Sequence, residues 1–158
     1  MKKNVAILVF DEIEVLDFAG PFEVFAVTDE LLGHTAFHTF TMSLKPGTVR
    51  SRNGLKIMPD FTLESCPPPH LIIVPGGAGT QPLLNMPALH EWLRIKSRTA
   101  EIVMSVCTGA LILGRAGLLD ELRATTHHKC FEELRLHAPR TEVVESERFV
   151  DNGKIITA

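Results

Sequence analysis

Neither a long hydrophobic run nor an excess of basic residues occurs in this 158-residue sequence. Asp and Glu number 19 against 16 Lys and Arg, so the net charge is −3 and no basic face for nucleic acid is indicated. The apolar run at residues 5–10 meets Asp11 and Glu12 directly, and it is too short for a secretory signal or a membrane span. We therefore expect a soluble, cytoplasmic protein with no membrane partner and no nucleic-acid partner through this domain.

Cysteine is scarce as well. The three cysteines, Cys66, Cys107 and Cys130, match neither a disulfide framework nor a metal-ligand spacing. An odd number of thiols suits a reducing compartment in which one of them can be reactive. The glycine-rich stretch 75–79 is not followed by the Gly-Lys-Ser/Thr of a phosphate loop. We expect no metal and no cofactor, and we interpret Cys66 and Cys130 as structural.

What is present is an alternation of short apolar runs with helical patterns, and this alternation predicts an α/β fold. The continuously apolar runs suit a doubly wound, mostly parallel central sheet with helices on both faces. One domain over residues 1–158 is expected. Strands are predicted at 4–10, 36–44, 49–52, 55–58, 71–74, 102–106, 142–144, 148–150 and 154–158. Helices are predicted with Pro21 in the first turn, at 88–96, at 110–116 and at 131–137.

The stretch around Cys107 organises the chain. A β-branched run at 102–106 precedes it, and helix-forming residues follow it up to a stop at Gly117. This places Cys107 on a strand-to-helix elbow, the position of a nucleophile, with a helix N-terminus expected to lower the pKa of its thiol. On this stretch alone, a buried structural cysteine is an equally good interpretation.

Two further features are predicted on the same rim of the sheet, at the carboxyl ends of its strands. Asp17 lies between the first strand and the helix that follows, where it is either a site carboxylate or a helix-capping residue. Gly76 and Gly77 end the strand at 71–74, and their free N–H groups could bind a developing oxyanion. A plain turn is the alternative for the two glycines.

Four segments in this order resemble the ThiJ/PfpI superfamily, which has the class I glutamine-amidotransferase-like fold. They are VAILVFDEIEVLDFAGPFEVF, LIIVPGGAG, SVCTGALILGRAGLL and RATTHH. The pair VLDFAGP and CTG resembles the isonitrile hydratase-like branch. The resemblance implies catalysis by Asp17, Cys107 and Thr108, and it matches His127 to a histidine that could line the pocket. Thr108 stands where the peptidase-like members have a histidine, so peptidase activity is not expected.

The resemblance implies a cysteine-dependent hydratase acting on a small molecule, possessing no cofactor and forming a homodimer. A ligand-sensing domain related to AraC-type regulators and a cysteine redox sensor are the alternatives. Glu14 or Glu23 could replace Asp17 as the partner of Cys107. In the superfamily the strand that reads IITA here runs on into a long C-terminal helix, so we expect one sheet face to be partly bare. His127 and His128 could also be ordinary surface or core groups.

Overall fold

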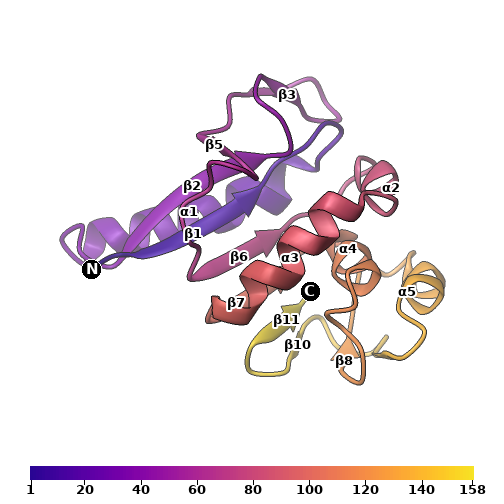
Figure 1. Cartoon of the computed structure of the whole chain (residues 1–158). Coiled ribbons are helices and arrows are strands. Elements are labelled where there is room, and N and C mark those ends of the chain that lie inside the picture. The colour runs from indigo at the N-terminus through magenta and orange to yellow at the C-terminus, as the bar shows by residue number, and fades with distance from the viewer.

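Apolar strands build the centre of a seven-stranded sheet in the computed structural model, which describes residues 1–158 (Figure 1). The strand order is β10-β11-β7-β6-β1-β2-β5, and all pairs are parallel except β10 with β11. The seven strands are β1 (Lys3–Leu8), β2 (Phe37–Ser43), β5 (Phe61–Thr62), β6 (Leu71–Val74), β7 (Ile102–Ser105), β10 (Val150–Asp151) and β11 (Ile155–Thr157). The two smaller sheets pair β3 (Val49–Arg50) with β4 (Lys56–Ile57) and β8 (Arg123–Ala124) with β9 (Glu142–Val143).

Helices lie on both faces of this sheet, which confirms the predicted α/β architecture. In Figure 1, α1 (Val15–Leu31) lies behind β1 and β2, whereas α3 (Pro87–Thr99) lies in front of β6 and β7, with α4 (Gly109–Arg115) beside it on the right. The remaining helices are α2 (Thr80–Leu83) and α5 (Phe131–His137). No helix combines the length and the apolarity that crossing a membrane requires.

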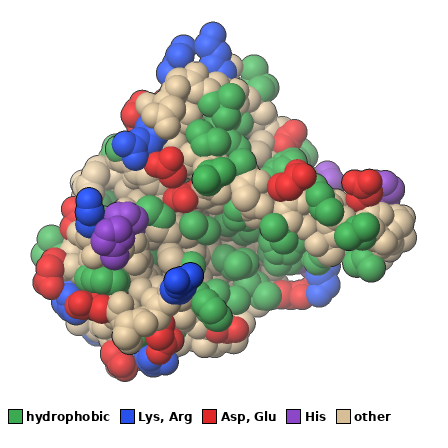
Figure 2. All heavy atoms as spheres, turned by 180° about the vertical axis from the view of Figure 1, so that it is seen from behind, with side chains coloured by type: hydrophobic (Ala, Val, Ile, Leu, Met, Phe, Trp, Pro, Cys, Tyr) green, Lys and Arg blue, Asp and Glu red, His purple; other side chains and the backbone are tan.

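Part of the rear face carries no helix. Figure 2, the view from behind, shows hydrophobic side chains gathered there around a hollow. A hollow of about 610 Å³ beside α1 is lined by eight hydrophobic residues, among them Ile102, Met104 and Ile156. Exposed apolar surface of this kind is unusual for an isolated domain.

The first helix begins earlier than expected. It starts at Val15, so Asp17 lies in its first turn and Pro21 lies inside it. A proline there removes the bond that its nitrogen would give to the carbonyl of Asp17, and its ring crowds the same carbonyl, so tertiary packing must compensate. Phe18 before Pro21, and Phe22 and Phe25 after it, pack against the core, which favours helix on both sides of the proline. The prediction that Asp17 lies before the helix was therefore wrong.

Other differences are smaller. The short elements β5 and α2 were not predicted, because two to four residues show no periodicity. The hairpin of β3 and β4 is confirmed, with Gly54 at φ +89° in its turn. In α3, Leu89 and Leu93 are buried, whereas Ile95 is 51% exposed. The apolar residues of α1 are divided between its two sides, since Phe18 is buried whereas Val24 and Val27 face outward.

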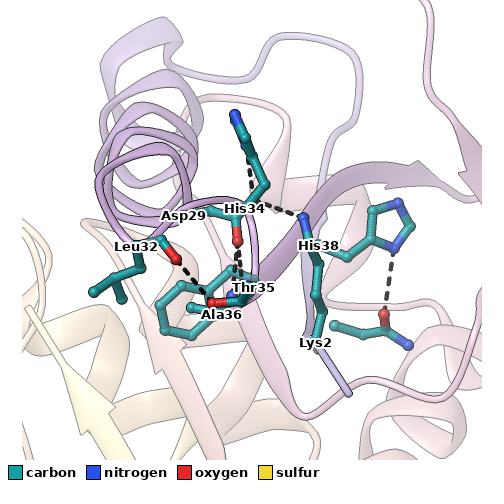
Figure 3. Close-up of polar contacts among 9 residues, drawn as sticks. Lys2, Asp29, Leu32, His34, Thr35, Ala36 and His38 are labelled. Atoms are coloured by element: carbon teal, nitrogen blue, oxygen red, sulfur yellow. Dashed lines mark hydrogen bonds and ion pairs between the residues drawn. The ribbon is translucent and has the colours of Figure 1, made fainter.

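A buried carboxylate ties the end of α1 to the start of β2 (Figure 3). Asp29 accepts hydrogen bonds from the N–H groups of Ala36 and Phe37 at 2.9 and 2.8 Å. Its other oxygen binds Lys2 Nζ at 2.7 Å and lies 3.5 Å from His34 Nδ1. The ammonium of Lys2 and the two N–H groups hold the pKa of Asp29 far below its usual 3.8, against the opposing effect of burial.

Replacing Asp29 with asparagine is therefore expected to lower the melting temperature at pH 7 by about 5 °C or more. Because the folded-state pKa of Asp29 is depressed, its stabilisation is present above pH 3.8 and is lost as the pH falls further. Thermal melts of both proteins at several pH values should show their difference shrinking in acid. Glu30→Gln, at an exposed neighbour on the same helix, is the control. A difference that stays constant with pH contradicts the assignment.

Candidate functional site

The elbow between β7 and α4 holds Cys107 in a strained conformation. Its φ is +56°, a region that residues with a side chain rarely occupy. The backbone on both sides is fixed, because Cys107 N–H donates to the carbonyl of Ala158 at 2.8 Å and Thr126 Oγ1 donates to the carbonyl of Cys107 at 2.9 Å. Two residues after Cys107, position 109 must be a glycine, since a Cβ there would lie 2.0 Å from the carbonyl oxygen of Val74. The sequence thus presents a thiol at the carboxyl end of a central strand.

Asp17 reaches the same place from α1. Its Oδ2 accepts a hydrogen bond from Gly76 N–H at 3.2 Å, and its carboxyl interacts with the Cys107 thiol. Burial raises the pKa of Asp17 above its usual 3.8, while the Gly76 N–H and the thiol act in the opposite direction. A half-buried carboxyl with a raised pKa can both accept and return a proton.

The two glutamates that could have replaced Asp17 do not take its place. Glu23 is exposed further along α1 and does not line the cavity at Cys107. Glu14 does line that cavity, but its carboxylate is paired with Arg52 at 2.9 Å. Of the three carboxyl groups, Asp17 is the one that interacts with the thiol.

The two glycines do not offer free N–H groups, contrary to expectation. Gly76 N–H is used by Asp17, and Gly77 N–H donates to Thr108 Oγ1 at 3.0 Å. Gly76 nevertheless cannot be replaced without a steric clash, because a Cβ there would lie 2.7 Å from Thr108 Oγ1. Gly77 has φ +126°. The glycine turn therefore positions the side chains of Asp17 and Thr108, while the N–H of Thr108 itself faces the sulfur.

The thiol is not activated in the way the sequence suggested. Burial and the neighbouring Asp17 carboxylate raise the pKa of Cys107 to about 11, against the opposing effect of Thr108 N–H and hydroxyl. The expected lowering of the thiol pKa by a helix N-terminus was wrong, because burial of the sulfur and the neighbouring Asp17 carboxylate both raise it. At neutral pH Cys107 is a thiol that needs a base.

A cavity of about 580 Å³ opens over this group. His127 lines it, as its match to the family suggested, and its Nδ1 accepts from Lys129 N–H at 3.3 Å. Twelve residues form the wall: Glu14, Asp17, Arg52, Gly77, Ala78, Thr80, Gln81, Cys107, Thr108, His127, Cys130 and Glu133. No cluster of three His, Cys, Asp or Glu side chains has the geometry for a metal ion.

Sequence reasoning missed several of these wall residues. Arg52, Gln81 and Glu133 come from a hairpin, a short helix and α5, and none belongs to a recognisable motif. Cys130, interpreted as structural, also lines the cavity. Only the folding of distant segments brings these side chains to Cys107. Thr80 could have been suspected from its position after the glycine turn, and its Oγ1 does donate to the Gly77 carbonyl at 2.9 Å.

Known proteins resemble the chain along its whole length. The DJ-1/PfpI family profile matches residues 3–158. Isonitrile hydratase of Pseudomonas putida is 39% identical over 127 residues, which cover 80% of this chain and 53% of that protein. The transcriptional regulator GbdR of Pseudomonas aeruginosa is 27% identical over 157 residues, which cover 96% of this chain and 42% of the regulator. The chain thus spans about half the length of these two relatives.

Solved structures of the same family share the fold of this chain. The crystal structure of a ThiJ/PfpI family protein from Pseudomonas syringae superposes with a TM-score of 0.83 at 28% identity, covering all of this chain and 62% of that one. DJ-1 of Schizosaccharomyces pombe superposes with a TM-score of 0.81 at 16% identity, covering 98% of this chain and 82% of DJ-1, which supports the fold alone. With the family profile matching almost every residue, this chain belongs to the DJ-1/PfpI family.

Proposed function

We propose that this domain hydrates isonitriles to N-substituted formamides, with Cys107 as the nucleophile. The observation that carries the proposal is the meeting of Cys107, at a strained elbow, with a carboxyl of raised pKa from α1. The 39% identity to an isonitrile hydratase supports this reaction over others open to a cysteine and a carboxyl. The reaction uses no cofactor and adds one water to the substrate.

In the first step Asp17 accepts the proton of the Cys107 thiol as the sulfur attacks the terminal carbon of the isonitrile. The carboxylate can do this because it lies beside the thiol, whose pKa of about 11 keeps it protonated at neutral pH. A sulfur–carbon bond forms, and Asp17 returns the proton to that carbon, which gives a thioimidate. The raised pKa of Asp17 suits this exchange in both directions.

In the second step water adds to the thioimidate carbon. Asp17 takes one proton of this water and passes it to the substrate nitrogen, which gives a tetrahedral intermediate. Asp17 then takes the proton of the new hydroxyl group as the carbonyl forms and the carbon–sulfur bond breaks, and it returns that proton to the departing sulfur. The products are the formamide and the free thiol, so the enzyme is regenerated. Thr108 supplies an N–H and a hydroxyl beside the sulfur, and its Oγ1 is held at 3.0 Å from Gly77 N. In the proposed reaction these two groups would stabilise the negative charge on the sulfur as the carbon–sulfur bond breaks.

Incubation with cyclohexyl isocyanide, followed by measurement of N-cyclohexylformamide, tests this proposal directly. Formamide should accumulate in proportion to enzyme over many turnovers. Circular dichroism of the same sample establishes that the domain is folded. A folded domain that forms no formamide rules the hydratase out.

A ligand-sensing role is the second candidate. It is supported by the regulator GbdR, which this chain matches over 96% of its length. The same cavity would then bind a small molecule without turning it over. Ligand-dependent stabilisation without product formation would favour this role. A redox sensor is less well supported, because a thiol with a pKa of about 11 is a poor target for oxidants that attack thiolates.

We further propose a homodimer formed through α1. Its outer face carries Leu16, Val24, Val27 and Leu31, which are 76%, 63%, 39% and 80% exposed. The spacing of the last three, three and four residues apart, is that of one helix stripe. A second copy presents the same apolar stripe, so a twofold interface would bury both. Three free thiols would suit a reducing, cytoplasmic compartment.

Replacing Val24 with glutamate should separate this dimer. Two equivalent charges would be buried across the twofold axis, and dissociation is expected to become at least about 100-fold more favourable. Light scattering after size exclusion should then report the 17.5 kDa monomer. Leu136→Glu, at a residue of α5 that is 74% exposed, is the control. A wild-type protein that is already monomeric contradicts the proposal.

A further inference from the structure

The wall of the Cys107 cavity is polar and carries an uncompensated negative charge. Ala78 and two cysteines are its only hydrophobic members, and no aromatic side chain other than His127 is among them. Three carboxyl groups, those of Glu14, Asp17 and Glu133, face a single guanidinium.

The one cation of the wall is already occupied. Arg52 Nη1 lies 2.9 Å from Glu14 Oε2, so these two charges largely neutralise each other. Asp17 is engaged with Gly76 N–H and the thiol. Glu133 is therefore the carboxyl group of the cavity that is engaged neither with a cation nor with the thiol of Cys107.

Glu133 lies on the wall of the cavity, and its carboxylate forms no ion pair. It comes from the first turn of α5, and it accepts a long hydrogen bond of 3.4 Å from Gln81 Nε2. It also lies against the Cys130 thiol, whose pKa is raised by burial and then by the Glu133 charge. The adjacent Glu132, in contrast, is exposed and paired with Arg135 at 2.6 Å. A cationic ligand in the cavity would give Glu133 the ion pair that the protein itself does not supply, and the hydrogen bond between them would be charge-assisted.

We infer that Glu133 selects ligands that carry a protonated primary or secondary amine at a distance from the group that meets Cys107. An ammonium with N–H donors fits better than a quaternary one, because the wall offers a carboxylate and an amide oxygen but no cage of aromatic rings. This inference rests on the proposed function in one respect, namely that ligands enter the Cys107 cavity. It concerns recognition and requires no turnover.

The test measures the electrostatic preference of the cavity with Cys107 as the reporter. Three methanethiosulfonates of similar size, carrying an aminoethyl, a sulfonatoethyl or a neutral methyl group, are reacted with the protein. Each exchanges its sulfinate group for the thiolate sulfur and forms a mixed disulfide. Peptide mass spectrometry follows labelling at Cys107 separately from Cys66 and Cys130. Each rate is divided by that of a small free thiol, so the intrinsic reactivity of each reagent cancels.

The wild type is expected to prefer the aminoethyl over the sulfonatoethyl reagent by about 50-fold, and Glu133→Gln should reduce this ratio by about five- to tenfold. Any change in the pKa of Cys107 affects both reagents equally and leaves the ratio unaltered. Glu132→Gln, an identical change of charge one residue away, should alter the ratio by less than about twofold. Added salt should lower the ratio of the wild type, which gives a readout that needs no variant.

A wild-type ratio near one, or equal effects of the two glutamine variants, overturns the inference. These outcomes are separate from failure of the hydratase proposal. A protein that makes no formamide but shows the expected ratio keeps the amine-selective cavity and loses the hydratase reaction. A protein that makes formamide but shows a ratio near one keeps the hydratase reaction and loses the amine-selective cavity.

Discussion

Cys107→Ala should abolish formation of formamide from cyclohexyl isocyanide, with turnover falling by about 10⁴-fold or more. Without the sulfur no thioimidate can form, and the remaining groups only position water near a substrate that reacts slowly with it. The strained backbone should survive, because alanine also has a Cβ and the bonds from Cys107 N–H to Ala158 and from Thr126 to its carbonyl use no sulfur atom. Gas chromatography of the formamide measures the effect.

Cys66→Ala provides the matched control for loss of a thiol. Cys66 is buried, 8% exposed, and lies outside the cavity wall, so this variant should turn over at the wild-type rate once it is folded. A Cys107→Ala protein that retains activity within a factor of about ten would show that the sulfur forms no covalent intermediate.

Asp17→Asn is expected to lower turnover by about 100- to 1,000-fold, since an amide cannot accept the thiol proton. The same change should lower the pKa of Cys107 below its value of about 11, because the Asp17 charge is one of the causes that raise it. Activity and thiolate content should therefore move in opposite directions. The pH dependence of iodoacetamide labelling at Cys107 measures the pKa, and the formamide assay measures turnover.

The pH profile gives a second test of Asp17. In the wild type, kcat/KM should rise with pH as Asp17 ionises, and this rise should lie above the usual carboxyl value of 3.8 because its pKa is raised. In Asp17→Asn that limb should disappear, leaving a slow rate that grows toward the pKa of the thiol. Glu23→Gln, at an exposed carboxylate of the same helix, should keep the wild-type profile. If Asp17→Asn turns over as fast as the wild type, Asp17 transfers no proton.

Most of the fold could be predicted because its elements are marked locally. The runs at 71–74 and 102–106 are apolar and β-branched, and they became β6 and β7 in the centre of the sheet. The helix at 131–137 was predicted at its observed bounds. The beginning of α1 was not predicted correctly, because Pro21 is typical of the first turn of a helix. The helix instead begins at Val15, where packing of Phe18 in the core favours it. Periodicity over two to four residues also could not reveal β5 or α2.

The sequence by itself determined which chemistry is available at the elbow, a thiol followed by Thr108 and Gly109, and it placed Asp17 on the same rim. Tertiary structure decided how those groups behave. The Gly76 and Gly77 N–H groups are consumed in holding Asp17 and Thr108. The thiol pKa rises rather than falls. The reason is that desolvation and charge depend on what surrounds a group, and Asp17, Glu133 and Cys107 come from distant parts of the chain that only folding brings together.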